Sequence, residues 1–125
     1  MLSAGVDVVH IPRMQHALDR HGERVLQRLF TPREIAACAG RAHEFAARFA
    51  AKEAVSKALG VGMRIMAADG VPFHDVEILP DGNGQPHVHL HGEAASRAGA
   101  LGLTDWAVSL THEREYAVAF VVATG

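Results

Sequence analysis

The sequence predicts an α+β fold in which a largely antiparallel sheet packs against one long, alanine-rich helix. Three observations indicate this fold. Stretches rich in β-branched residues, which are typical of strands, alternate irregularly with helical stretches. Two pairs of the strand-like stretches are joined by short polar turns. The longest helical stretch contains seven alanines. A chain of 125 residues fits one domain, residues 1–125, without a separate regulatory module.

The start of the chain predicts a strand followed by a helix. Residues 5–9 form a short apolar run that ends before Pro12, and this order is typical of a buried strand that leads into a helix. Pro12 suits the first helical position because its missing N–H would have no helical partner there. We expect the helix to cover residues 11–21 and to end at Gly22.

The rest of the chain predicts three more helices and two hairpins. Thr31, with Glu34 three positions later, has the capping-box spacing and begins a helix that runs to about residue 39 and ends at Gly40. The alanine-rich helix covers residues 41–59 and ends at Gly60. The remaining expected elements are a loop at 60–72, strands at 73–79 and 86–91 around a turn at 80–84, a helix at 93–101, and a hairpin of strands at 106–112 and 116–123.

Composition and charge exclude several classes of protein. Hydrophobic residues make up 49% of the chain, which excludes a disordered tail. The longest apolar stretch, residues 116–124, is about half of the roughly 20 residues that a membrane-spanning helix needs, so no membrane segment is expected. A net charge of −2 argues against a simple basic nucleic-acid binder. The N-terminus lacks a secretory-signal pattern and the single Cys38 has no disulfide partner, so we expect a cytoplasmic protein.

Asp7 is the first candidate functional residue, because it lies in the middle of the predicted strand 5–9. An ionised carboxylate in a buried strand costs several kcal/mol unless a cation or hydrogen-bond donors compensate it. Asp7 therefore indicates a nearby metal ion or arginine. The alternative is a strand at the edge of the sheet, with Asp7 facing water, and the residues alone leave both interpretations open.

The alanine-rich helix carries a second group of candidates. Glu53 and Lys57 are four residues apart and so lie on one face, as do Arg48 and Lys52. Ordinary local ion pairs would explain this spacing, but the helix is otherwise small and apolar, so we expect its charges to be substantially buried. Asp7 and Glu53, on different elements, can together hold a hard cation such as Mg²⁺. Lys57 and Arg48 can then neutralise phosphate groups of a substrate.

Four segments carry a resemblance to a known family. They are GVDVV at residues 5–9, RFAAKEAVSKALG at 48–60, VSLTHE at 108–113 and YAVA at 116–119. In order and spacing they resemble the bacterial holo-acyl-carrier-protein synthases, which are small phosphopantetheinyl transferases, and the likeness spans nearly the whole chain. The resemblance implies a phosphopantetheinyl-transferase-like fold. It also implies transfer of the phosphopantetheine arm of coenzyme A to a serine of apo acyl carrier protein, with release of adenosine 3′,5′-bisphosphate.

The same resemblance implies roles for individual residues. Asp7 and Glu53 look like ligands of Mg²⁺, or of Mn²⁺, and together with Lys57 they form the implied catalytic set. Lys57 is similar to the residue that contacts the pyrophosphate and steadies the attacking group. The implied contacts to coenzyme A are Arg48, Lys57, Gly60, Thr111 and His112.

One position departs from the family pattern. Many members carry an acid three residues after the strand aspartate, where this chain has His10. Mg²⁺ prefers oxygen ligands, so the sequence gives no third carboxylate for the metal at this position. The family is also trimeric with sites at subunit interfaces, which implies a homotrimer here. The predicted strand 116–123, which is apolar on both faces, fits that expectation.

The helix 11–21 is the candidate docking surface for an acidic carrier protein. Arg13 and Arg20 lie seven residues apart on one side of it, Met14 lies beside them, and Arg24 continues the stripe if the helix resumes after Gly22. In the family such a basic, partly apolar helix serves this purpose. The alternative is an ordinary solvated face.

Other patterns carry less weight. His87, His89 and His91 alternate along a strand and could bind zinc, although an exposed polar face is the favoured interpretation. No nucleophile-elbow turn surrounds Ser109, which rejects a serine hydrolase. Two alternative functions remain: a coenzyme A or carrier-protein binding module without transfer activity, and a metal-dependent nucleotide phosphohydrolase. The intact set of candidate residues disfavours the first, and the extent of the resemblance disfavours the second.

Overall fold

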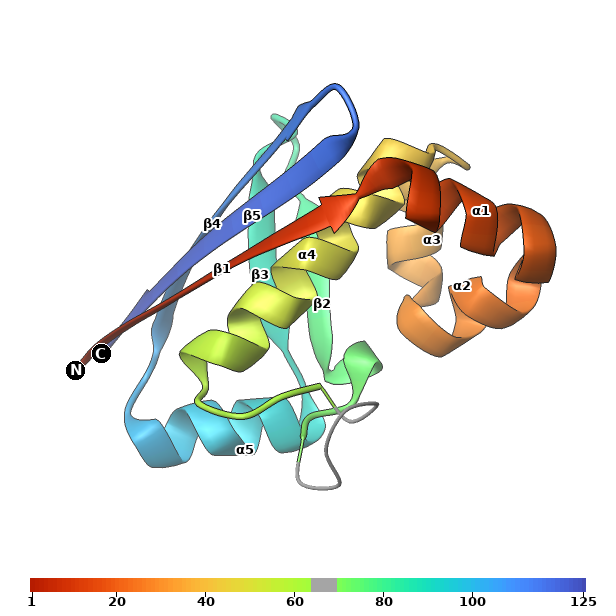
Figure 1. Cartoon of the computed structure of the whole chain (residues 1–125). Helices are drawn as coiled ribbons and strands as arrows, with labels where there is room; N and C mark the ends of the chain where they lie inside the picture. The colour runs from red at the N-terminus through yellow and green to blue at the C-terminus, as the bar shows by residue number, and fades with distance from the viewer. Residues whose placement is uncertain (64–69) are drawn as a thin grey trace.

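The computed structural model describes residues 1–63 and 70–125, so the expected loop at 60–72 lies partly outside the described residues (Figure 1). The architecture is α+β, as predicted. In chain order the elements are β1 (Leu2–His10), α1 (Ile11–His21), α2 (Glu23–Leu29), α3 (Pro32–Cys38), α4 (Ala42–Ala58), the 3₁₀ helix η1 (Phe73–Asp75), β2 (Val76–Pro80), β3 (Pro86–Leu90), α5 (Gly92–Leu101), β4 (Asp105–Glu113) and β5 (Tyr116–Thr124).

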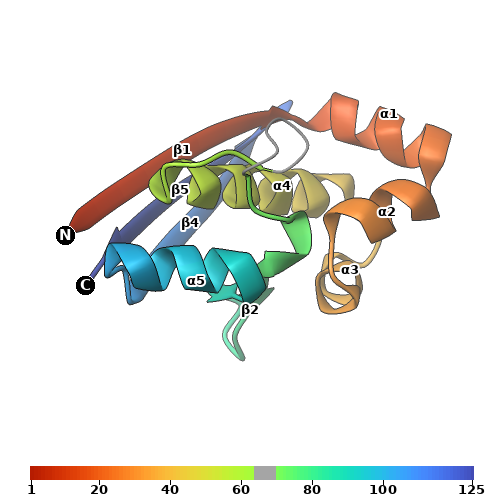
Figure 2. The same cartoon turned by 90° about the horizontal axis from the view of Figure 1, so that it is seen from below.

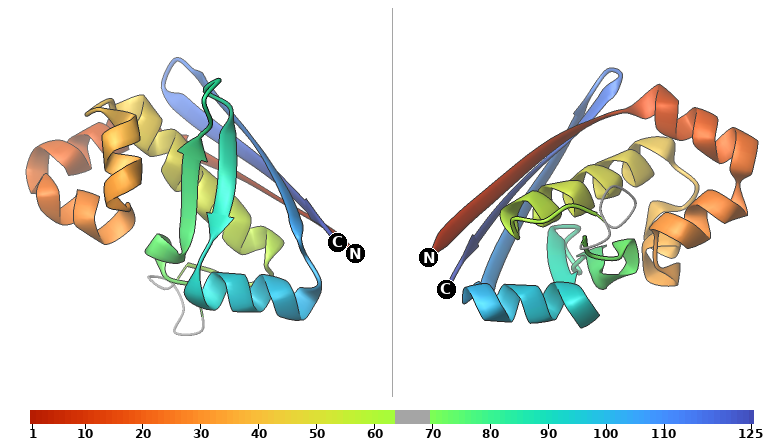
Figure 3. Two further views of the ribbon diagram at one scale, coloured as in Figure 1. Left: turned by 180° about the vertical axis from the view of Figure 1, so that it is seen from behind. Right: turned by 60° about the horizontal axis from the view of Figure 1, so that its bottom comes forward.

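The strands form two antiparallel sheets. One has three strands in the order β1-β5-β4 and the other consists of the β2–β3 hairpin. β1 pairs with β5 along its whole length, with Asp7 opposite Ala119, and it lies at one edge of its sheet. Figure 3 shows the β2–β3 hairpin next to β4, with which β3 is in contact. Both hairpins that the turn residues predict are therefore present.

Helix α4 is the centre of the molecule. Eleven of its 17 residues are buried, and six of these are alanines. It packs on β1 and β5, and Figure 2 shows it along one side of the three-stranded sheet, with α1, α2 and α3 grouped beyond one end. The small side chains let other backbones approach closely. The closest approach is at Gly5 of β1, where an added Cβ would lie 1.9 Å from the carbonyl oxygen of Ala54.

A buried ion pair joins α4 to α3. Lys52 and Glu34 are both fully buried, and the lysine Nζ lies 2.8 Å from Glu34 Oε1. Lys52 also donates to the carbonyl oxygen of Phe73, while Glu34 Oε2 accepts from the backbone N–H of Ile78. Glu34 completes the predicted capping box with Thr31 at the start of α3. Burial lowers the pKa of Lys52, although the negative charge of Glu34 opposes that shift.

Glu77 of β2 extends these polar contacts. The Thr31 hydroxyl donates to Glu77 Oε2 at 2.6 Å, the His91 ring nitrogen lies 3.1 Å from Oε1, and Arg33 lies 3.8 Å away. Partial burial alone would raise the pKa of Glu77. The hydrogen bonds from Thr31 and His91 and the charge of Arg33 outweigh it, so that the pKa lies below the ordinary value of 4.5. These contacts hold α3 and the start of α5 against β2.

The side of the three-stranded sheet that faces away from α4 is apolar and exposed. Strand alternation turns Ala117, Ala119, Val121 and Ala123 of β5 toward the core, where all are buried. The opposite side, called the outer sheet face below, includes Val6 and Val8 of β1 with Tyr116 and Phe120 of β5, each about half exposed. Figure 2 shows helices α4 and α5 on the other side of this sheet.

Two elements differ from the predictions. Helix α2 is the first: Gly22 ends α1 after His21, as predicted, but with a φ of +47° it then turns the chain directly into α2, which the sequence pattern does not predict. The expected strand 73–79 begins as the 3₁₀ turn η1, in which the carbonyl oxygen of Phe73 accepts a hydrogen bond from Lys52. In the described part of the chain no helix is both long and apolar enough to cross a membrane.

Candidate active site

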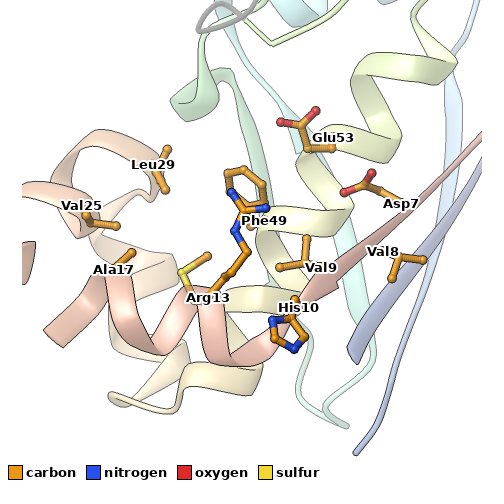
Figure 4. Close-up of a pocket in the computed structure, with 11 residues that line it drawn as sticks. Asp7, Val8, Val9, His10, Arg13, Ala17, Val25, Leu29, Phe49 and Glu53 are labelled. Atoms are coloured by element: carbon orange, nitrogen blue, oxygen red, sulfur yellow. The ribbon is translucent and has the colours of Figure 1, made fainter. Parts of the chain in front are cut away.

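Asp7 and Glu53 face each other across the contact between β1 and α4 (Figure 4). Alternation along β1 turns Gly5, Asp7 and Val9 toward α4, and the missing side chain of Gly5 lets the strand lie directly on the helix. Asp7 is neither deeply buried nor fully solvated, since its side chain is 20% exposed on an edge strand. Both of the earlier interpretations are therefore partly correct: β1 is an edge strand, and Asp7 has a cationic partner.

The partner of Asp7 is Lys57. Its Nζ lies 3.1 Å from Asp7 Oδ1 and also donates to the carbonyl oxygen of Val6 at 2.9 Å. The lysine thus bridges to β1 rather than forming the local pair with Glu53 that the spacing suggests. Burial raises the pKa of Glu53, the negative charge of Asp7 raises it further, and Lys57 partly offsets both. Two carboxylates that repel each other in this way are a suitable donor pair for a cation.

A cavity of about 440 Å³ opens beside the carboxylate pair. His10 and Arg13 lie at its polar side, and Phe49 of α4 belongs to its apolar wall (Figure 4). The other lining residues are Val8, Val9, Met14, Ala17, Val25 and Leu29. The pocket therefore combines two carboxylates and a cationic side chain with an apolar surface between α1, α2 and α4.

Among the described residues, this region offers two carboxylates to a cation. Within residues 1–63 and 70–125, no group of three or more His, Cys, Asp or Glu side chains is arranged to hold a metal ion. His10 lines the same cavity, but its ring nitrogen lies 3.5 Å from Glu115 and its ring packs on Tyr116. His87 is likewise paired, at 2.8 Å from Asp81. The remaining coordination positions of a cation at Asp7 and Glu53 would belong to water or substrate oxygens.

Arg48, Thr111 and His112 meet at a different cavity, of about 280 Å³. Arg48 is 4% exposed, and its Nη1 lies 2.8 Å from Glu44 Oε2, while its buried Nε has no hydrogen-bond partner in the described part of the chain. The ring of His112 packs against that of His43, with centroids 4.8 Å apart. This second group is rich in donors. The remaining lining residues are Glu44, Ala47, Gly84, Pro86 and Leu110.

The two groups are separate within one chain. Among the residues that the structure describes, none lines both the cavity at Asp7 and the cavity at Arg48. Gly60 belongs to neither: it follows α4 with a φ of +74°, beside Leu59, whose carbonyl oxygen accepts from Arg97. The structure thus brings the predicted catalytic residues together, and it also brings three of the predicted coenzyme A contacts together. Within one chain, however, these two sets of residues lie apart.

The candidate docking residues lie at the α1–α2 end. Arg13 and Arg20 are exposed and line a surface hollow on α1, and Arg24 is exposed on α2. Met14 is 6% exposed and packs in a core cluster that includes Phe30. The cationic stripe is therefore at the surface, whereas Met14 is chiefly a core residue that reaches the cavity wall.

Sequence reasoning missed His43 and Glu44. Glu44 stands four residues before Arg48, a helical spacing that could have identified it as the arginine's partner. His43 has no such signal, because its contact with His112 joins the first turn of α4 to the end of β4. Phe49, which stacks on Phe73 with centroids 5.6 Å apart, was also not singled out.

Comparison with known proteins decides the family. A model of the 4′-phosphopantetheinyl transferase superfamily matches residues 3–121. The chain belongs to this superfamily. A holo-[acyl-carrier-protein] synthase of Halorhodospira halophila is 50% identical over 121 residues, covering 94% of this chain and 93% of that protein. Another, of Herpetosiphon aurantiacus, is 43% identical over 127 residues and covers both chains fully.

Solved structures of other superfamily members confirm the fold. The Helicobacter pylori holo-[acyl-carrier-protein] synthase in complex with coenzyme A superposes with a TM-score of 0.85 at 29% identity, covering 97% of this chain and 99% of that one. The synthase of Neisseria meningitidis gives a TM-score of 0.83 at 32% identity, with 98% of each chain covered. The predicted phosphopantetheinyl-transferase-like α+β fold is therefore correct.

Proposed function

We propose that this chain is a holo-acyl-carrier-protein synthase, which transfers the phosphopantetheine arm of coenzyme A to a serine of apo acyl carrier protein. The carrying observation is the convergence of Asp7, Glu53 and Lys57 at the contact of β1 with α4, in a chain that belongs to the superfamily along nearly its whole length. In the reaction the serine hydroxyl loses its proton to solvent, and its oxygen bonds to the β-phosphorus of coenzyme A. The bond from that phosphorus to the bridging oxygen breaks, and adenosine 3′,5′-bisphosphate leaves with the electron pair.

Asp7 and Glu53 would hold Mg²⁺, or Mn²⁺, and their oxygen donors and mutual repulsion fit such an ion. Bound there, the ion supplies charge neutralisation to the pyrophosphate. Lys57 lies beside Asp7 with more than half of its side chain exposed, so its ammonium group can turn toward a substrate phosphate. Its positive charge then stabilises the negative charge that develops on the leaving phosphate.

Arg48, Thr111 and His112 would bind the nucleotide end of coenzyme A, and Gly60 would give the arm room beside the end of α4. Because these residues and the carboxylates occupy different cavities of one chain, we propose that each site combines groups from two subunits of a homotrimer. The exposed outer sheet face supports such an assembly, since it presents apolar side chains that a partner subunit could cover. Light scattering at the assay concentration would report a mass of three chains, and a monomer would contradict this part.

The acidic acyl carrier protein would dock on the cationic end of the molecule formed by α1 and α2. Arg13, Arg20 and Arg24 are exposed there, and the cavity that contains Asp7 opens between the same helices. A carrier protein bound at this end would bring its serine close to the carboxylate pair. Met14 would contribute only through the cavity wall.

The test is the mass of an apo carrier protein incubated with coenzyme A, Mg²⁺ and this protein. We expect the increase that corresponds to one phosphopantetheine group, and we expect Asp7→Asn and Glu53→Gln each to abolish most of it while folding normally. Rates within about threefold of wild type would contradict the metal-ligand assignment, because loss of such a ligand costs several kcal/mol. Binding of coenzyme A without transfer would instead favour a binding module, and hydrolysis of coenzyme A without carrier protein would favour a phosphohydrolase.

A further inference from the structure

His43 is placed to control the orientation of His112. It lies in the first turn of α4, and its ring packs on that of His112 at a centroid distance of 4.8 Å and an interplanar angle of 42°. His112 itself is exposed near the end of β4, next to the turn that leads to β5. An exposed imidazole at a strand end has free rotation unless another group restricts it. In the described part of the chain, the one ring that packs on His112 is that of His43.

Glu44 links His43 to the arginine of the same cavity. Its Oε2 accepts from Arg48 Nη1 at 2.8 Å, and its Oε1 lies 3.6 Å from His43 Nε2. The side chain of His43 is 36% exposed, so it is partly held by this neighbourhood rather than fully solvated. Arg48, Glu44, His43 and His112 therefore form one contiguous row from α4 to β4, and both ends of the row line the cavity.

The row leaves donors available to an anion. Thr111 and His112 are exposed and line the cavity, as does Arg48, whose buried Nε has no hydrogen-bond partner among residues 1–63 and 70–125. Glu44 lies there as well, but its Oε2 is already bound by Arg48. A phosphate-bearing ligand fits these groups, and its affinity depends on whether the His112 ring is already in place when the ligand arrives.

We propose that His43 is a positioning residue, whose ring holds His112 in the orientation that binds the phosphate-bearing nucleotide end of coenzyme A. This inference rests on the proposed function. His43 need not touch coenzyme A, because its effect passes through the ring of His112. The effect is on binding, since His112 would contact the nucleotide end of coenzyme A, and within one chain neither histidine lines the cavity that contains the carboxylate pair.

The first measurement compares His43→Ala with His43→Phe. Ordering one freely rotating side chain corresponds to about a 3- to 10-fold change in affinity, so His43→Ala should raise the KM for coenzyme A by about that factor and leave kcat unchanged. His43→Phe keeps a flat ring beside His112 and should restore the KM to within about twofold of wild type. The matched control is His89→Ala, an exposed histidine on β3, which should change neither constant.

The second measurement is a double-mutant cycle with His112→Ala. When His112 is absent, His43→Ala should raise the KM no further, because the ring through which it acts is gone. The proposal would be overturned if His43→Ala raised the KM equally in the presence and absence of His112. It would also be overturned if His43→Ala lowered kcat at constant KM, or if His43→Phe did not restore the KM. Calorimetric titration of coenzyme A into the same variants gives the cycle without any turnover. If wild type binds coenzyme A but transfers nothing, the proposed function is wrong. The calorimetric affinities of the variants would still test the role of His43.

Discussion

Replacing Gly5 with alanine tests how the fold positions the carboxylate pair. Gly5 lies two residues before Asp7 on β1, against Ala54, which follows Glu53 on α4. The added Cβ would lie 1.9 Å from the carbonyl oxygen of Ala54 and 2.8 Å from its carbonyl carbon. Both atoms belong to the backbone of a central helix and cannot turn aside as a flexible side chain could. The strand must therefore move away from α4.

The size of that movement sets the expected effects. Carbon and oxygen atoms that are not bonded approach to about 3.3 Å, so β1 and α4 must separate by roughly 1 Å or more near residue 5. A misplacement of about 1 Å at a catalytic group can lower a rate about 100-fold. Overpacking of this kind also costs about 1–3 kcal/mol of stability, which lowers Tm by several degrees in a domain of this length. We expect both changes from a single added methyl group.

The assay measures carrier-protein modification by mass spectrometry and Tm by circular dichroism. Gly99→Ala is the matched control, because an added Cβ on α5 meets nothing within 4 Å. It should leave the rate unchanged and raise stability slightly, since alanine is favoured over glycine inside a helix by about 0.5–1 kcal/mol. If Gly5→Ala kept the wild-type Tm and a rate within about threefold of wild type, close packing of β1 on α4 would not be what positions Asp7.

Three further predictions concern stability and docking. Lys52→Met should lower the free energy of unfolding by about 3–5 kcal/mol in urea titrations, because it leaves the Glu34 carboxylate buried without its cation. Adding Glu34→Gln should recover part of the loss. A double variant less stable than Lys52→Met would contradict this reasoning. Since the pKa of Glu77 lies below 4.5 in the folded protein, its stabilising contribution is complete above that pH and is lost as pH falls through the lowered pKa. Thermal unfolding from about pH 7 to about pH 3 should therefore show a steeper loss of Tm below that value for wild type than for Glu77→Gln, and parallel curves would refute it. Changing Arg13 and Arg20 to glutamate should weaken carrier-protein binding but not coenzyme A binding, and binding of the carrier protein to wild type should weaken as salt is added. Calorimetry at low and high salt measures both effects. Salt-independent binding of the carrier protein would show that these arginines form only a solvated face.

Local signals predicted most of the fold, because they act within a few residues. The Thr31 capping box, Gly102 at the end of α5 and the alternation in the last hairpin all mark real boundaries. Gly22 also marks the end of α1 correctly, but a helix stop does not show whether a loop or a second helix follows, and α2 was therefore not predicted.

The candidate site was predictable to the extent that its residues share one helix or carry a recognisable pattern. Arg48 and Glu53 are five residues apart, which places them about 140° apart around the helix axis, so their presence in different cavities follows from helical geometry. The partner of Lys52 could not be found in this way, because Glu34 lies 18 residues earlier on another helix. Such pairings depend on how elements pack, and spacing along the chain does not encode them.

Substitutions at the buried alanines of α4 are expected to give variants that are folded at low temperature and unfold at a higher one. A core residue that is already alanine has few smaller replacements, so nearly every mutation there adds atoms to a contact without spare room. One or two added methylene groups cost about 1–3 kcal/mol against a total stability of about 5–15 kcal/mol. Chains with such a change at Ala50, Ala51 or Ala54 would fold at low temperature and unfold on warming. In a screen for transferase activity that is lost on warming, the responsible changes should therefore map to the middle of α4 more often than to exposed residues.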